Sequence, residues 1–250
     1  MLGDVWGVTQ LHDVVYMVCP ESSAITRFNA TTHQRLTDII VKDLRIAWDI
    51  AGCELTSHVY IADAVECVWR VSSEGEDIKR WLSKSPSDTF RPWRLSVTSS
   101  RLLVTSRKTK QLMQLDEAGN ELRRVQLPEY MVPDHAVESP TATFIVGHYN
   151  TELDQHQVSE VNTEGQVLRQ FSGVRYAENV AVDSRGNIFV ADTDSRRILL
   201  LDAQLALSRV IIDECQLNYK EPQSLCYREQ SGQLLVELGH SVAVFDVLCR

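Results

Sequence analysis

The stretch Tyr176-Ala-Glu-Asn-Val-Ala-Val-Asp-Ser-Arg-Gly-Asn-Ile-Phe-Val-Ala-Asp192, followed by Arg197-Ile-Leu-Leu-Leu-Asp202, decides the fold. It contains a short strand, a glycine turn, a strand rich in β-branched and aromatic residues, a polar loop and a third strand. A fourth strand follows at Ser208-Arg-Val-Ile-Ile212. Four short strands joined by turns in about 45 residues have the size of one β-propeller blade.

The same frame recurs along the whole chain. Its second strand and the residue after it are clearest at His58-Val-Tyr-Ile-Ala-Asp63, Arg101-Leu-Leu-Val-Thr-Ser106 and Thr143-Phe-Ile-Val-Gly-His148. No segment keeps a helical apolar period, so we expect an all-β fold. The repeats predict a single six-bladed propeller domain over residues 1–250, with blades at about 1–43, 44–88, 89–130, 131–173, 174–218 and 219–250.

These repeats resemble the NHL-repeat family of six-bladed propellers. The resemblance rests on the Pro/Ala-x-x-Ile/Leu-Ala/Ser-Val start and on the Ile188-Phe-Val-Ala-Asp192 strand with Arg197-Ile-Leu after it. The family usually has glycine third in the opening motif, and no repeat has it in this alignment. The last blade ends just past a third strand, so we expect it to lack its outermost strand and to close the ring by face packing. Whether the chain is a fragment of a multidomain protein stays open.

One register of the opening motif is polar in every repeat. Its six residues, which we expect to form a polar ring at the mouth of the central channel, are Asp4, Asp49, Arg94, His135, Asn179 and Ser224. Two interpretations are open. The carboxylates, imidazole and amide suit a divalent ion or a small ligand. Alternatively, the channel only needs a polar lining, with Arg94 pairing with Asp4 or Asp49.

Three histidines of the fourth repeat, His135, His148 and His156, raise the question of zinc. This pattern is faintly similar to the peptidyl-hydroxyglycine lyases, whose metal histidines come from separate blades. Asp4, Asp49 and Asn179 similarly suggest the calcium-dependent lactonase-type propellers. No Gly-x-Ser-x-Gly elbow and no phosphate-binding glycine loop is present. We therefore assign no catalytic residue, metal ligand or cofactor, and keep a metal-dependent propeller enzyme as an alternative function.

Charge is unevenly distributed. The chain has 25 Lys+Arg against 34 Asp+Glu, a net charge of −9 that argues against a general nucleic-acid binder. Residues 79–124, however, hold eleven basic and four acidic residues, a net charge of +7, which leaves −16 for the rest. Propeller geometry places the loop before the first strand and the loop between strands two and three on one face. We expect a partner-binding surface there, formed by Arg91, Trp93, Arg94, Arg107, Lys108, Lys110, His148 and Tyr149.

The favoured function is a non-enzymatic binding or scaffold module that recognises a protein partner through this loop-rich face. Single-stranded RNA is the alternative partner, because basic residues with interleaved aromatics bind phosphates and stack on bases. NHL domains of tripartite-motif proteins include RNA binders, so the resemblance implies this alternative too. No apolar run approaches the roughly 18 residues of a membrane span, so we expect no membrane partner. Without a visible secretory signal, we expect a cytoplasmic location.

Overall fold

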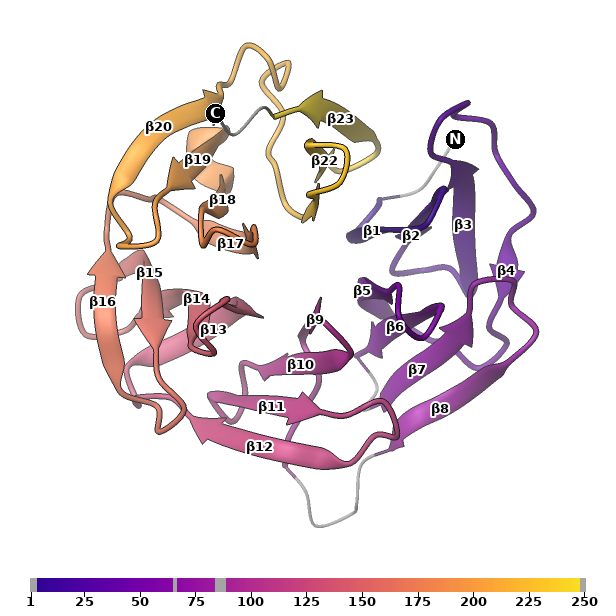
Figure 1. Ribbon diagram of the computed structural model, residues 1–250, viewed down its shortest axis with the longest axis horizontal. Coiled ribbons are helices and arrows are strands. Elements are labelled where there is room, and N and C mark those ends of the chain that lie inside the picture. The colour runs from indigo at the N-terminus through magenta and orange to yellow at the C-terminus, as the bar shows by residue number, and fades with distance from the viewer. Residues whose placement is uncertain (1–3, 65–66, 84–88, 248–250) are drawn as a thin grey trace.

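The computed structural model describes residues 4–247 except 65–66 and 84–88. Its strands form six antiparallel sheets arranged as blades around a central axis (Figure 1), which makes the fold an all-β, six-bladed propeller. In each sheet the first strand in sequence is innermost and the others follow outward in chain order.

The strands are as follows. Blade 1 contains Gly7–Leu11 (β1), Val14–Val18 (β2), Ala24–Asn29 (β3) and Ile39–Ile40 (β4). Blade 2 contains Ala47–Cys53 (β5), His58–Asp63 (β6), Cys67–Ser72 (β7) and Ile78–Ser83 (β8). Blade 3 contains Arg94–Thr98 (β9), Arg101–Ser106 (β10), Gln111–Leu115 (β11) and Glu121–Gln126 (β12). Blade 4 contains Met131–Glu138 (β13), Phe144–Asn150 (β14), Gln155–Val161 (β15) and Val167–Phe171 (β16). Blade 5 contains Ala177–Val182 (β17), Ile188–Asp192 (β18), the 3-10 turn Thr193–Ser195 (η1), Arg197–Leu201 (β19) and Leu207–Ile212 (β20). Blade 6 contains Leu225–Arg228 (β21), Gln233–Glu237 (β22) and Val242–Asp246 (β23).

Burial changes from the inside of a blade to its outside. Every residue of β18 is buried, because the inner strands are covered on both faces by the neighbouring blades. The outermost strand β12 is exposed at most positions and carries Arg123 and Arg124. Continuous apolar runs therefore mark the second strand of each blade, and charged residues mark the outer strands.

Glycine residues occupy the turns that lead into the outermost strands of blades 2, 3 and 4. Gly75, Gly119 and Gly165 all have positive φ, between 80° and 91°. Glycine takes this left-handed backbone without a steric penalty, which explains its place between the third and fourth strands of blades 2, 3 and 4.

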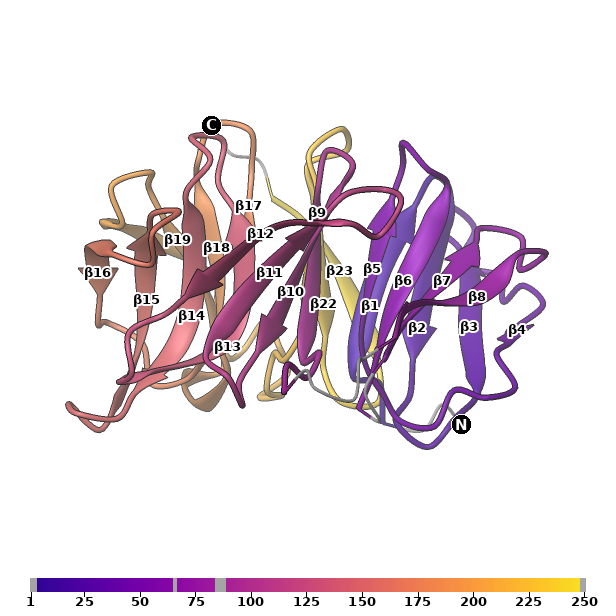
Figure 2. The ribbon, with the colours of Figure 1, turned by 90° about the horizontal axis from the view of Figure 1, so that it is seen from below.

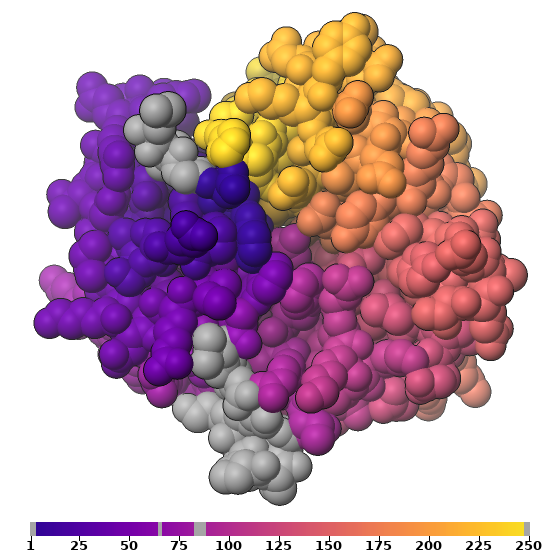
Figure 3. Space-filling model, turned by 180° about the vertical axis from the view of Figure 1, so that it is seen from behind, coloured from indigo at the N-terminus to yellow at the C-terminus, as the bar shows by residue number. Residues whose placement is uncertain are grey.

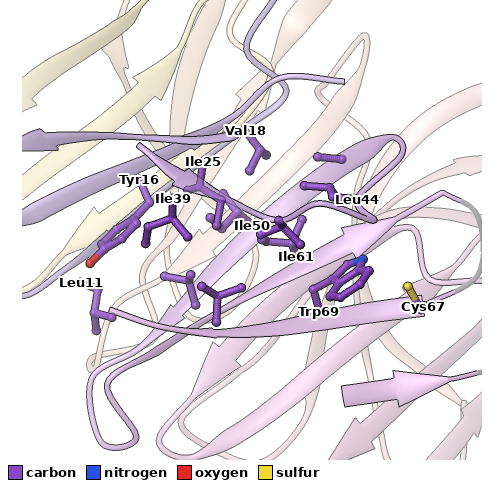
Figure 4. Packing of buried hydrophobic residues seen from close by; sticks show 14 residues of the cluster. Leu11, Tyr16, Val18, Ile25, Ile39, Leu44, Ile50, Ile61, Cys67 and Trp69 are labelled. Atoms are coloured by element: carbon purple, nitrogen blue, oxygen red, sulfur yellow. The ribbon is translucent and has the colours of Figure 1, made fainter. Parts of the chain in front are cut away.

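Apolar clusters between the blades hold the ring together. Figure 4 shows the cluster between blades 1 and 2, where Leu11, Ile25, Ile50, Ile61 and Trp69 interdigitate. Equivalent clusters lie between blades 2 and 3, 3 and 4, 4 and 5, and 5 and 6. Burial of these side chains supplies the main stabilising free energy of the ring.

The ring closes by contact of blade 6 with blade 1. In the described residues blade 6 has three strands, whereas each of the other five sheets has four. The closing contact includes a small cluster containing Val5, Val8, Met17 and Leu235, and a 2.6 Å bond from the Val5 N–H to the Gly239 carbonyl. The expectation of face packing at the closure is therefore met.

The disc has two faces, which Figure 2 shows edge-on. We call the face that carries the loops between blades and the loops between second and third strands the inter-blade face. The opposite face, with the remaining turns, is the hairpin face. Within the described residues no helix is long and apolar enough to cross a membrane.

Candidate functional site

Strand register defines two adjacent rings around the channel. Asp49, His135 and Asn179 pair with Ala62, Gly147 and Ala191, which occupy one equivalent position of the second strands. In blade 1 the equivalent partner is Val18, and it pairs with Gly7. The structure therefore places Gly7, and not Asp4, in this channel ring, whose members are Gly7, Asp49, Arg94, His135, Asn179 and Ser224.

Asp4 lies elsewhere. It is exposed, and its Oδ1 is 2.8 Å from Nδ1 of His240 in blade 6. Gly7 allows close packing at the ring position, since a Cβ there would lie 2.9 Å from the Ile50 nitrogen and 3.0 Å from Asp49 Oδ1. The glycine that the opening motif otherwise lacks is thus present in blade 1, three residues later than the alignment assumed.

Arg94 crosses the channel and joins four blades. Its guanidinium donates to the carbonyl oxygens of Trp6, at 2.9 Å, and Trp48, at 3.3 Å. It also bonds Glu178 Oε1 of blade 5 at 3.0 Å and lies 3.8 Å from Asp49 Oδ1. Arg94 is only 6% exposed, so it is an internal tie between blades and cannot belong to a partner-binding surface as predicted.

The other ring members also bond to neighbouring inner strands. Asp49 Oδ2 accepts the Leu95 N–H at 2.8 Å. His135 Nδ1 accepts the Val180 N–H at 3.3 Å, so Nε2, 3.1 Å from the Leu95 carbonyl, carries the proton. Burial raises the pKa of Asp49 to about 6 and lowers that of His135 to about 4. These bonds favour the structural interpretation, in which the polar ring satisfies inner-strand backbone groups.

A central cavity of about 590 Å³ extends from the channel ring toward the hairpin face. Asp49, His135, Asn179 and Ser224 line its inner end, and Glu54, Arg228 and Glu229 lie at the other. Asn179 Oδ1 is buried there without a hydrogen-bond partner, whereas Asp49 and His135 are bonded to backbone groups. The titratable side chains at the inner end of the cavity, Asp49 and His135, are therefore already bonded within the fold.

The residues that end the second strands hold the inter-blade loops. Asp63 accepts the N–H groups of Arg45 and Ile46, and Asp192 accepts those of Arg175 and Tyr176. Ser106 does the same for Arg91 at 3.2 Å. These aspartates thus act as hydrogen-bond acceptors for the loop that precedes the first strand of their own blade.

A second ring lies one residue before the channel ring, at the inter-blade end. We call it the mouth ring, and its members are Trp6, Trp48, Trp93, Asp134, Glu178 and Gln223. Trp48, Asp134 and Glu178 are the extra residues of β-bulges in blades 2, 4 and 5. A bulge re-aims the side chain of the inserted residue, and in blade 2 it places Trp48, partly exposed, at the edge of the apolar cluster between blades 2 and 3.

Three tryptophans of the mouth ring form an aromatic arc across blades 1 to 3. The ring centroids of Trp6 and Trp48 are 4.4 Å apart, and those of Trp48 and Trp93 are 4.2 Å apart. All three side chains stay partly exposed. Arg107 lies over the Trp93 ring at 5.0 Å and extends the arc toward blade 4.

The arc continues into an acidic and aromatic half over blades 4 and 5. Arg107 is 3.5 Å from Asp134, and Asp134 is 3.6 Å from Nδ1 of His156. The His156 ring lies 4.3 Å from Tyr176 and 5.1 Å from Tyr149.

Figure 3 shows the face on which the N-terminal part of blade 1 (indigo) lies against blade 6 (yellow), as the Val5–Gly239 bond requires.

Burial dominates the acids of this half. It raises the pKa of Asp134 to about 7, against the opposing effect of Arg107, and that of Glu178, against the effect of Arg94. The pKa of Tyr176 rises to about 12 through burial and the nearby carboxyl groups of Asp134 and Glu178. The mouth ring thus combines three indoles with two carboxyl groups that hold protons unusually firmly.

The residues predicted for the partner-binding surface, other than Arg94 and His148, differ in their exposure and in the contacts that they already make. Lys108 is exposed, and Arg91, Trp93, Arg107 and Tyr149 are partly exposed. Lys110 is held by the Glu129 carboxylate, and the Tyr149 hydroxyl donates to Asp154. The positive charge expected for blade 3 is therefore largely compensated by carboxylates. The predicted basic segment also includes Lys84, which lies outside the described residues.

His148 does not reach the surface. It is fully buried, its Nε2 lies 2.8 Å from Ser159 Oγ, and burial lowers its pKa to about 4. In the part of the chain that the structure describes, no three His, Cys, Asp or Glu side chains are grouped to hold a metal ion. The three histidines of blade 4 thus have separate surroundings.

Comparison with known proteins supports the fold alone. No protein-family profile and no curated protein sequence matches the chain. Among solved structures, hydrazine synthase of Kuenenia stuttgartiensis superposes with a TM-score of 0.71 at 11% identity, covering 100% of this chain and 97% of that one. A nidogen/laminin complex gives 0.70 at 15% identity, covering 89% and 84%. Virginiamycin B lyase of Staphylococcus aureus, solved with quinupristin, gives 0.70 at 12% identity, covering 98% and 80%. The six-bladed propeller is thus supported, whereas NHL membership stays a prediction.

Sequence reasoning missed the mouth ring as a unit. Trp6, Trp48, Asp134 and Glu178 were not among the predicted site residues. A signal was present: tryptophan stands immediately before the channel-ring residue in Trp6-Gly7, Trp48-Asp49 and Trp93-Arg94. Aligning the repeats on that tryptophan would also have corrected the register of blade 1.

Proposed function

We propose that this propeller is a protein-recognition module and that the inter-blade face is its binding surface. The observation that carries the proposal is the aromatic arc of Trp6, Trp48 and Trp93, partly exposed side chains from three successive blades in mutual contact. Tryptophan, tyrosine and arginine dominate the energetics of protein interfaces, and the two aromatic residues bury a large area with little loss of side-chain entropy.

The composition of the face favours a protein over RNA. A phosphate backbone needs uncompensated positive charge. Arg94 is buried, Arg107 faces Asp134, and Lys110 is paired with Glu129. Asp134 and Glu178 add carboxyl groups to the same mouth. A mixed surface with an indole centre and a charged rim fits a folded protein or peptide partner.

Site-specific photo-crosslinking tests the proposal. A crosslinking amino acid is placed at position 108, on the inter-blade face, and in a matched protein at position 55, in the β5–β6 turn of the hairpin face. Both native residues, Lys108 and Leu55, are exposed, so neither replacement disturbs packing. We expect a discrete protein adduct from position 108 and none from position 55.

The partner identified in this way is then titrated against variants. Trp48→Ala is expected to weaken binding about thirtyfold, which corresponds to the loss of an interface hot spot. Lys108→Glu changes an exposed rim charge and should alter mainly the association rate. Thermal unfolding of each variant verifies that the ring stays folded. Unchanged affinity in both Trp48→Ala and Trp93→Ala would rule out the arc as the binding surface.

Salt dependence separates the RNA alternative. Binding of a mixed single-stranded RNA pool must weaken steeply between about 50 and 200 mM salt if phosphates are contacted. We expect no saturable RNA binding. A steep salt slope that disappears in Lys108→Glu would replace the protein-recognition proposal with RNA binding.

A further inference from the structure

The outer edge of blade 6 differs from the corresponding position in every other blade. Strand β23 is the third strand of its sheet, and no fourth strand follows it in the described residues. The third strands β11 and β19 are buried at four of their five positions, whereas none of the five residues of β23 is buried. Val244 is 43% exposed, whereas Gln114 and Leu200 at the same register are 5% and 7% exposed.

Backbone hydrogen bonds show what covers this edge elsewhere. The residue at the end of each third strand donates its N–H to the carbonyl of the residue leading into the fourth strand. These bonds are Asn29 to Gln34, Ser72 to Asp77, Asp116 to Asn120, Asn162 to Gln166 and Asp202 to Ala206. The sixth equivalent donor is Asp246, and no such carbonyl accepts its N–H among the described residues.

The register of the hairpin identifies the other open groups. The Leu238 N–H donates to the Ser241 carbonyl, and antiparallel pairs alternate between bonded and non-bonded. The N–H and C=O groups of Val242, Val244 and Asp246 therefore point away from β22, toward the open edge. An unpaired, partly apolar edge of this kind adds a further strand readily.

The complete blades also specify the side chain that belongs opposite Val244. In blades 2 to 5 the fourth strand carries a basic residue at this register: Lys79, Arg123, Arg169 and Arg209 face Arg70, Gln114, Glu160 and Leu200. In blade 1 the short strand β4 does not reach this register. In blade 5 the basic residue lies opposite the aliphatic Leu200, and in blade 6 it would lie opposite the aliphatic Val244. The long stem covers the apolar side chain while the charged end remains in water.

We propose that the open edge of β23 binds an extended segment of a partner protein, which adds antiparallel as the fourth strand of blade 6 and carries a basic residue opposite Val244. Main-chain hydrogen bonds supply the affinity, and the preference for a basic residue opposite Val244 supplies the selectivity. The net charge of −9 favours the same type of segment. This surface lies on the rim and is independent of the mouth ring.

A peptide copying one of the protein's own outer strands is the probe. The capped, labelled peptide Gly119-Asn-Glu-Leu-Arg-Arg-Val-Gln-Leu127 is titrated into the full chain. By the register of β12, the amides of Arg123 and Val125 face the third strand, and that of Arg124 points away. N-methylation at the Arg123 position should weaken binding about tenfold, because it removes a main-chain hydrogen bond. N-methylation at the Arg124 position should have no effect.

Hydrogen exchange locates the bound peptide without altering the protein. Added to β23, the peptide should slow exchange of the Val244 and Asp246 amides. Faster exchange of the Arg123 and Val125 amides of β12, with no change in β23, would mean that the peptide displaces β12 and would overturn the proposal. Equal binding of the two N-methylated peptides, or no binding, would also overturn it. A dimer that the peptide dissociates would assign the edge to a second copy and not to a partner protein.

Discussion

The interfaces between blades 1 and 2 and between blades 6 and 1 both join neighbouring blades of the ring. Different contacts form them. Between blades 1 and 2, a large apolar cluster includes Leu11 and Trp69, and the Tyr16 hydroxyl donates to the Ser73 carbonyl at 3.0 Å. Between blades 6 and 1, the buried cluster is small, and Glu237, a carboxylic acid, is buried beside the Gly239 N–H. The comparison teaches that the closing interface has the smaller buried apolar cluster and carries a titratable group.

Loss of Arg94 should give the largest effect, because this residue joins blades 1, 2, 3 and 5. In Arg94→Leu the buried carboxylates of Asp49 and Glu178 lose their counter-charge. Removing one partner of a buried ion pair costs about 4 kcal/mol. Equilibrium urea unfolding measures it, with Arg101→Leu, whose side chain is 42% exposed, as control. Equal stabilities of these two variants would contradict the central role of Arg94.

A matched pair of leucines compares the two interfaces directly. Leu11 is fully buried between blades 1 and 2, and Leu235 is 1% exposed at the closure. Truncation of a buried leucine to alanine costs about 3 kcal/mol, with a larger loss where more neighbours surround the cavity. We expect Leu11→Ala to be more destabilising than Leu235→Ala in the same urea titration. The reverse order would show that the closing interface is the better packed one.

The repeat pattern predicted the fold and located most of the channel ring. Period, turn glycines and apolar strands are local properties, and they survive in every blade. Blade 1 was misaligned by three residues because Asp4-Val-Trp-Gly-Val lacks the usual start of the motif. The strand pairing places Gly7 opposite Val18 and corrects this register.

The burial of Arg94 and His148 could not be predicted in the same way. The partners of Arg94 include the carbonyl oxygens of Trp6 and Trp48, and main-chain groups leave no trace in residue identity. The partner of His148 is Ser159, which becomes a neighbour only when β14 pairs with β15. Charge counted along the sequence therefore overestimated the positive charge available on blade 3.

The acid at the closing interface predicts a pH dependence. Burial raises the pKa of Glu237 to about 8, far above the value of an unfolded chain. The folded state thus retains a proton that the unfolded state loses above its own pKa, so Glu237 makes stability fall as pH rises from about 4.5 to 8. Glu237→Gln removes this dependence. At pH 9 the variant should exceed the parent by about 2 kcal/mol, and at pH 4 the two should agree.

Glu237 has charged neighbours whose contributions must be separated from its own. Glu178 and Asp4 raise its pKa and Arg94 lowers it, after the larger effect of burial. Urea unfolding of the parent and of Glu237→Gln at each pH isolates Glu237 together with its coupling to these neighbours, because groups that do not interact with it titrate equally in both. A difference that stays constant from pH 4 to 9 would show that Glu237 is ionised in the folded protein.

The smallest effect should come from single hydroxyl groups between blades. Ser96 Oγ donates to the Ala136 carbonyl at 2.8 Å and links blades 3 and 4, whereas Ser224 in blade 6 makes no side-chain hydrogen bond to another described residue. Ser96→Ala should cost about 1 kcal/mol, since it leaves a buried carbonyl short of a donor. Ser224→Ala should stay within about 0.5 kcal/mol of the parent. If urea unfolding instead gave both variants the same loss, side-chain bonds between inner strands would not distinguish the closing blade from the rest of the ring.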